Sequence, residues 1–205
     1  MPIPITWKSM MSEPVNIIRS FVEGRLEPAD LEKLLGNDKE LQAALATVEI
    51  YNRTSGEGLL CHIISMNFND LRSIYVIQRS LADYLASIGV SFAFSSRYDD
   101  LLELLADAQP KWLSLPGDYL FSMIREFNSS GNSGNLKKWI KDEIKRRFVY
   151  ANKPPKWLQG AQWPIVDGVP LKFIEQVENT AMHDTSCDYK FSDADNKIKI
   201  ITQIA

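Results

Sequence analysis

The sequence predicts an α+β protein, with a mainly helical N-terminal body over residues 1–150 and a small C-terminal antiparallel β-sheet over residues 151–205. Apolar residues recur at helical spacing up to about residue 148, and beyond residue 163 they alternate as strand residues do. Between these regions, residues 153–178 carry two of the five tryptophans, four of the ten prolines and an Asp-Gly turn. We expect both regions to pack as one compact unit.

Composition places the chain among ordinary globular proteins. Its 205 residues are 45% hydrophobic, and the formal net charge is −3. The N-terminus lacks a basic start followed by an apolar run, and no apolar stretch approaches the roughly 18 residues that a membrane span needs. We therefore expect a soluble, cytoplasmic protein without a membrane partner. Cys61 and Cys187 are too few and too distant to suggest a disulfide framework, so both thiols are expected to be reduced.

Three short amphipathic helices are predicted in the first part of the chain. The first begins near Glu13 and ends at Gly24. Pro28 suits the first turn of the second helix. Asp38 can cap the third, because an aspartate side chain accepts hydrogen bonds from the free amides of a first turn. Residues 1–12, with two prolines, are expected to be an extended lead-in.

A turn-rich break over residues 52–58 separates these helices from the next part. The apolar stretch 58–67 fits a helix or a buried strand, and we favour a helix. Asn69 or Asp70 then starts the longest helix, which Gly89 ends. Its apolar residues keep a 3–4 spacing over nearly three heptads, which is typical of a core helix and also compatible with a dimer seam.

Three further helices follow a strand or extended link at residues 90–94. One ends before Pro110, since proline disfavours helix in the residue before it. Another begins at Pro116. A loop over residues 128–135, rich in Ser, Asn and Gly, precedes the last helix at residues 136–148.

The last helix concentrates positive charge. Residues 134–156 hold eight cationic and two anionic side chains, net +6, which leaves −9 for the remainder. The simplest interpretation is a solvated face near a helix C-terminus. A surface for an acidic protein partner is the second, and nucleic acid is the weakest because the whole chain is acidic and carries no known nucleic-acid module. The candidate contact residues are Lys137, Lys138, Lys141, Lys145 and Arg146.

Two hairpins are predicted at the C-terminus, giving a sheet of about four strands. Asp167-Gly168 between apolar arms at 163–166 and 169–177 is typical of a type I′ turn. Alternation in the second arm would place Phe173 and Glu175 on one face. Residues 179–188 are expected to be irregular, and a second hairpin joins 189–191 to 197–204. Because Ile198 and Ile200 alternate with lysines, one face of this last strand should be wet.

Trp157 and Trp163 have two interpretations. Large aromatic residues beside a proline-stiffened loop are usually core residues. The alternative is an aromatic platform that contacts a ligand or a partner.

No arrangement of residues predicts catalysis, a cofactor or a metal. A metal site would need Cys61, His62, His183 and Cys187, whose spacing matches no zinc motif, and a His183/Cys187 dyad falls in a segment expected to be irregular. Asp193 starts a partial calcium-loop pattern that lacks the required glycine and final glutamate. Phosphate-binding glycine loops and the serine-hydrolase elbow are also missing from the sequence.

The stretch PPKWLQGAQWPIVDGVPLKFIEQ resembles a pattern, PPxW(I/L)Q…WP…G.PL.F..Q, of a loose group of small bacterial proteins. Some members resemble immunity proteins encoded beside interbacterial toxins. The matching positions are Pro154, Pro155, Trp157, Leu158, Gln159, Trp163, Pro164, Gly168, Pro170, Leu171, Phe173 and Gln176. The resemblance carries over no catalytic residue, and it implies a packed hairpin scaffold.

Together these features predict a non-enzymatic binding protein. The resemblance implies an immunity protein that neutralises a cognate toxin domain by direct contact. The alternative is a small-ligand-binding protein or enzyme with a pocket between helices and sheet, near Trp157 and Trp163.

Overall fold

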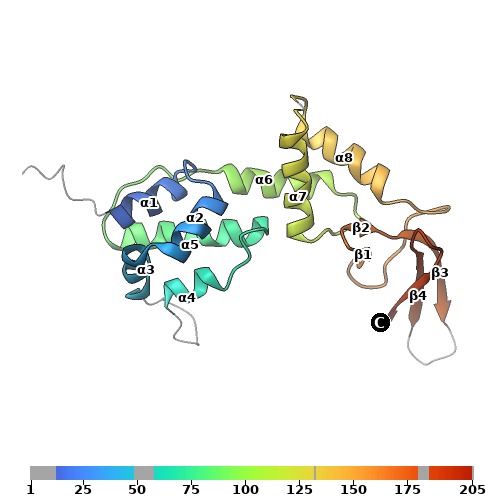
Figure 1. Cartoon of the computed structure of the whole chain (residues 1–205). Coiled ribbons are helices and arrows are strands. Elements are labelled where there is room, and N and C mark those ends of the chain that lie inside the picture. The colour runs from blue at the N-terminus through green and yellow to red at the C-terminus, as the bar shows by residue number, and fades with distance from the viewer. Residues whose placement is uncertain (1–12, 49–57, 132, 180–184, 205) are drawn as a thin grey trace, which may run out of the picture. The chain divides into compact units, whose positions relative to one another are not determined.

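The computed structural model describes residues 13–48, 58–131, 133–179 and 185–204. The extended lead-in at 1–12, the break at 52–57 and the middle of the irregular 179–188 segment fall outside these residues. Within them the chain forms eight helices followed by five short strands, so the predicted α+β class is confirmed (Figure 1). The chain divides into two compact units, Met1–Leu102 and Glu103–Ala205, whereas the change from helix to strand comes near residue 150.

The N-terminal unit is helical. Its first five helices have the predicted order, and α1 packs on α2, α3 and α5 while α3 packs on α4. Their bounds are α1 Glu13–Val22, α2 Pro28–Asn37, α3 Lys39–Ala46, α4 Leu59–Ile64 and α5 Leu71–Ser87. The helix α6, Arg97–Ala108, begins in this unit. The stretch at 90–94 is a link without strand structure.

Capping residues set the ends of these helices as the sequence predicted. Asp38 accepts hydrogen bonds from the amides of Glu40 and Leu41, and Asp70 does the same at the start of α5. Gly24 follows α1 with φ +75°, a conformation that side chains with a Cβ rarely adopt. A Cβ at this position would also lie 2.7 Å from the Ser95 hydroxyl. The chain therefore turns here because only glycine fits.

A buried amide joins the turn after α1 to the link before α6. Gln78 on α5 is fully buried, and its Nε2 donates to the carbonyls of Val22 and Ser95 at 3.0 and 3.1 Å. Leu71, Ile74, Ile77, Leu81 and Leu85 of α5 lie on the same buried face. The 3–4 pattern of α5 is thus the stripe of a core helix, which was the favoured interpretation.

The C-terminal unit contains two further helices, α7 Gly117–Ser129 and α8 Leu136–Arg147, packed on each other. Pro116 precedes α7, and the Asn135 side chain caps α8 by accepting from the Lys138 amide at 3.0 Å. Of the helices in the described part of the chain, none has the length and apolar character that crossing a membrane requires.

The first predicted hairpin is present. Strands β1, Ile165–Val166, and β2, Val169–Pro170, pair antiparallel around Asp167 and Gly168, whose φ values are 49° and 78°. Two successive positive φ angles define the type I′ turn that Asp-Gly favours.

The predicted second arm is wrong as a single strand. It divides at Leu171 into β2 and β3, Lys172–Asn179. The Leu171 amide donates to the Pro164 carbonyl at 3.0 Å, while its own carbonyl accepts from Trp163 Nε1 at 2.8 Å. With both backbone groups engaged toward the first arm, the chain leaves the hairpin and starts a different sheet.

That second sheet has three antiparallel strands in the order β3-β4-β5, with β4 at Ser186–Ser192 and β5 at Ile198–Ile204 (Figure 1). Five strands in two sheets replace the expected four. The second hairpin is confirmed, and Asp193 stabilises its turn by accepting from the amides of Asp195 and Lys197. Both β3 and β4 extend into the segment expected to be irregular.

A β-bulge breaks the alternation that the sequence suggested. The register of β3 on β4 shifts between Phe173 and Glu175, so Ile174 is the extra residue. Phe173 pairs with Phe191 and is 3% exposed, whereas Glu175 lies opposite Lys190 on the outer face. The two residues therefore lie on opposite faces, because the bulge changes the parity of the strand.

Candidate functional site

Trp163 belongs to the core of the C-terminal unit. It is 6% exposed, and its indole nitrogen is used inside the fold, donating to the Leu171 carbonyl. Its ring packs edge-on against Phe148 and Phe191, with centroids 5.5 and 5.4 Å apart. This placement agrees with the core interpretation of this tryptophan, and it leaves little ring surface for a ligand.

Trp157 is half-buried and lies against the sheet. Its Nε1 donates to the Trp112 carbonyl at 2.8 Å, and its ring centroid is 4.5 Å from that of Tyr189. The indole also stacks on Phe191 at 6.2 Å with an interplanar angle of 17°. Trp157 thus fastens the proline-rich segment to the inner face of the sheet.

Side chains from all three strands of the sheet hold this segment, residues 156–160, which we call the clamped segment. Gln176 of β3 accepts from the Lys156 amide at 2.7 Å. Tyr189 of β4 accepts from the Leu158 amide at 2.7 Å and donates to the Lys156 carbonyl at 3.0 Å. Burial raises the pKa of Tyr189 to about 12, so its hydroxyl keeps its proton at neutral pH.

Gln203 of β5 completes the clamp. It is 2% exposed, accepts from the Gln159 amide at 2.9 Å and donates to the Gly160 carbonyl at 2.9 Å. Gln159 in turn donates through its side chain to the Ile204 carbonyl at 2.6 Å. The backbone amides of Lys156, Leu158 and Gln159 and the side chain of Gln159 are therefore satisfied within the clamp, as a scaffold requires.

The cationic residues of α8 are largely paired within the unit. Lys137 contacts Asp107 at 2.9 Å and holds the pKa of that carboxyl below its usual range. Lys138 lies 3.6 Å from Asp142. By contrast, Lys141 and Lys145 form no ion pair with any residue that the structure describes.

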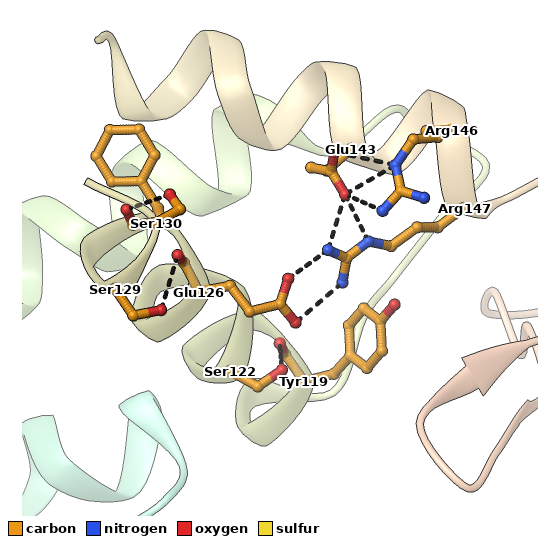
Figure 2. Close-up of polar contacts among 9 residues, drawn as sticks. Tyr119, Ser122, Glu126, Ser129, Ser130, Glu143, Arg146 and Arg147 are labelled. Carbon is orange, nitrogen blue, oxygen red and sulfur yellow. Dashed lines mark hydrogen bonds and ion pairs between the residues drawn. The ribbon is translucent and has the colours of Figure 1, made fainter. Parts of the chain in front are cut away.

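Arg146 and Arg147 take part in a network between α7 and α8, which Figure 2 shows. Arg147 pairs with Glu126 of α7 and with Glu143 of its own helix, and Arg146 also pairs with Glu143, at 2.6 Å. The Glu126 carboxylate raises the pKa of Arg147, with a further contribution from the Tyr119 hydroxyl that faces it in Figure 2. The guanidinium groups of Arg146 and Arg147 lower the pKa of Glu143, and the larger contribution comes from Arg146. Part of the predicted basic charge is thus neutralised locally, because Asp107 and Glu126 lie outside residues 134–156.

The structure does not bring the seven predicted contact residues together in one site. The two tryptophans support the clamp, and the five cations lie along α8. A hollow of about 180 Å³ lies beside Lys138 and Asp142. Neither Trp157 nor Trp163 lines this hollow or the larger groove beside β3. Among the residues described, no three His, Cys, Asp or Glu side chains are placed to hold a metal. His183 lies outside those residues.

A groove of about 290 Å³ lies beside β3, and we call it the β3 groove. Phe173, the bulge residue Ile174 and Pro154 line it together with Lys153 and Lys156. Asn152, Glu175 and Gln176 complete the lining. The sequence did not predict this site, because the groove depends on a β-bulge that no residue pattern indicates.

The outer face of β5 carries exposed isoleucines, which we call the isoleucine row: Ile198, Ile200 and Ile204. They are 57%, 54% and 55% exposed. The register explains their position, since Tyr189 and Phe191 of β4 face inward and lie opposite Ile201 and Lys199. The even-numbered residues of β5 must then face outward. Alternation with lysines implied that the lysine side would be the wet face. Instead the isoleucines lie on the outer face, and Lys199, although exposed, lies on the inward side opposite Phe191.

Comparison with known proteins gives no relative. No family model, no curated protein and no solved structure matches the chain.

Proposed function

We propose that this chain is a non-enzymatic binding protein that neutralises a protein toxin by direct contact, with the isoleucine row as part of its contact surface. The observation that supports this most is the exposure of Ile198, Ile200 and Ile204 on one strand face. Single exposed apolar residues are ordinary, whereas a contiguous set on one face is typical of a protein interaction surface. Val177 of β3, 42% exposed, adds to the same outer face.

The free edge of β5 favours contact through the face over pairing through the backbone. In the order β3-β4-β5, β5 is an edge strand. Lys197 and Lys199 lie at its start, and lysines on an edge strand discourage strand pairing with other chains. The isoleucine side chains remain accessible on the outer face. Burying them would contribute about 1 kcal/mol each, roughly half of the value for a fully exposed side chain.

Charge supports an acidic partner. The C-terminal unit has 14 cationic and 13 anionic side chains. Most of its α8 charges are paired internally, but Lys141, Lys145 and Lys199 form no ion pair among the residues described. Exposed lysines without an internal ion-pair partner attract a negatively charged protein and accelerate its association, although Lys199 lies on the opposite face of β5 from the isoleucine row. The resemblance to toxin-immunity proteins supports the toxin as the kind of partner.

Co-expression with the product of the adjacent gene tests the proposal. We expect a stable complex and protection of the cells from that product. The double variant Ile198→Thr/Ile200→Thr should weaken the complex about fivefold or more, because it removes about 1 kcal/mol or more of apolar burial at the contact.

The matched control is Ile64→Thr, since Ile64 is also 58% exposed but belongs to α4 of the other unit. It should leave the affinity unchanged. If the unaltered chain forms no complex and gives no protection, the proposed function is wrong. Equal weakening by the variants and the control would remove the isoleucine row as the contact surface.

A further inference from the structure

We propose that the β3 groove binds an extended acidic segment of a protein partner, which adds to the free part of β3 and places one carboxylate between Lys153 and Lys156. This inference rests on the proposed function only in that the ligand belongs to a protein.

The backbone of β3 shows where such a segment would lie. Residues 149–151 run beside the start of β3: Phe173 donates to the Val149 carbonyl at 2.9 Å, and the Ala151 amide donates to the Phe173 carbonyl at 3.0 Å. Tyr150 and Phe173 form a parallel bridge. At Asn152 the chain leaves this edge, and the groove opens between it and residues 173–176. An added strand would continue the line that residues 149–151 begin.

Beyond the bulge, the outer edge of β3 pairs with no other strand in the part of the chain that the structure describes. An edge strand presents backbone donors and acceptors that an extended peptide can use. The bulge at Ile174 ends the internal pairing and turns the strand at the groove, a role that bulges often have beside functional sites. The backbone therefore provides a start for strand addition and a free edge to continue it.

The side chains of the groove favour an anion. Lys153 and Lys156 are exposed and form no ion pair with described residues, whereas Glu175 is already paired with Lys190 at 2.8 Å. Gln176 uses its Oε1 to accept from the Lys156 amide, so its Nε2 remains available as a donor. A carboxylate entering here would find two lysines and an amide N–H as donors, while the one carboxylate of the lining, Glu175, is already paired with Lys190.

The apolar part of the β3 groove favours an aliphatic residue next to the acidic residue of the bound segment. Ile174 and Pro154 are partly exposed and provide a surface for one aliphatic side chain, while the ring of Phe173 is 3% exposed and is used in the core. The volume of about 290 Å³ is at the lower limit for small-molecule pockets, about 300–1,000 Å³, and suits one or two side chains. Glu175 and Glu178 make the rest of β3 acidic, so the bound segment should be acidic at the groove and neutral further along.

Peptide titration of the full-length, ¹⁵N-labelled chain tests the inference. The probes are acetyl-Val-Glu-Val-Thr-Val-Thr-amide and the same peptide with lysine in place of glutamate. We expect the glutamate peptide to shift the amide signals of Ile174, Glu175 and Gln176, and to bind at least tenfold more tightly than the lysine peptide. Its affinity should fall several-fold between 50 and 300 mM NaCl, because the contacts are exposed and screened by salt.

The variant Lys153→Glu/Lys156→Glu should weaken binding of the glutamate peptide at least tenfold. The control Lys172→Glu changes an exposed lysine of the same strand that does not line the groove, and it should bind as the unaltered chain does. Should the charge reversal alter the spectrum of the free protein, Lys153→Gln provides a milder variant with an expected loss of about threefold.

Equal binding of both peptides, shifts outside the β3 groove, or no shifts at millimolar peptide would overturn the inference. Concentration-dependent dimers that produce the same shifts without peptide would also overturn it, by assigning the groove to a second copy of the chain. These outcomes do not depend on the isoleucine-row variants, so failure of peptide binding at the β3 groove can be distinguished from failure of the proposed function.

Discussion

The clamp predicts a specific loss of stability when Gln203 is replaced by leucine. Leucine has a similar size, so the replacement fills the site but removes both polar groups. The amide of Gln159 and the carbonyl of Gly160 then lose their partners, which lie at 2.9 Å in each case. The perturbation is therefore confined to two hydrogen bonds in one buried position.

The magnitude follows from these contacts. A neutral hydrogen bond contributes about 1 kcal/mol net, and two give about 2 kcal/mol. Gln159 and Gly160 are exposed, so water can replace part of what they lose. We expect the free energy of unfolding of the C-terminal unit to fall by about 1–2 kcal/mol. For a unit of about 100 residues this lowers Tm by roughly 5–10 °C.

Tryptophan fluorescence during urea unfolding measures this change. Four of the five tryptophans belong to the C-terminal unit, and Trp157 lies in the clamped segment. Gln162→Leu is the control, because Gln162 is exposed and makes no hydrogen bond with the residues described. It should change stability by less than about 0.5 kcal/mol. Equal effects of the two variants would refute the reasoning that side chains of the sheet hold the proline-rich segment in place.

Three further results are expected. Arg147→Met should destabilise the C-terminal unit by about 1–2 kcal/mol in urea unfolding, because Arg147 is only 16% exposed and links two helices. Arg146→Met, at a 66% exposed side chain, should have a clearly smaller effect. The reverse order would contradict the network. Because the arginines lower the pKa of Glu143 in the fold, its contribution is complete above the unfolded value of about 4.3 and is lost as pH falls through the lower folded value. The stability difference between the unaltered chain and Glu143→Gln should therefore shrink between about pH 5 and pH 3, and a constant difference would disprove this assignment. Finally, circular dichroism melting should show that Gly24→Ala destabilises the N-terminal unit by at least about 1 kcal/mol, since a Cβ there meets Ser95, whereas Gly36→Ala inside α2 should stabilise it by about 0.5–1 kcal/mol; similar effects at both positions would be inconsistent with the constrained turn.

The helices and turns could be predicted because their signals are local. Asp38, Asp70, Gly24 and Gly89 act within four residues of themselves, and apolar spacing marks the buried face of each helix. The Asp-Gly hairpin is local in the same sense. The division of the second arm was not predictable, because it depends on a hydrogen bond from the side chain of Trp163.

The candidate sites were harder to predict because they depend on pairing between distant residues. The sequence shows a net charge of +6 at 134–156, but Asp107 and Glu126, which neutralise part of it, lie 30 and 21 residues from their partners. The β3 groove needs a register shift, and the isoleucine row needs the parity that β4 imposes on β5. None of these relations is visible in the spacing of residues along the chain.

The tryptophan- and proline-rich motif shows why a prominent motif need not be a contact site. Several of its long polar side chains are used inside the fold: the two indole nitrogens donate to carbonyls, and Gln159 and Gln176 accept or donate within the clamp. A group already satisfied in this way has little to offer a partner, because breaking its bond would cost as much as the new one provides. Lysines without an ion pair among the described residues are Lys156 within the motif and Lys153 beside it, and exposed apolar side chains lie in the isoleucine row. In this unit the motif builds the scaffold, and recognition falls to the residues that the scaffold leaves without partners.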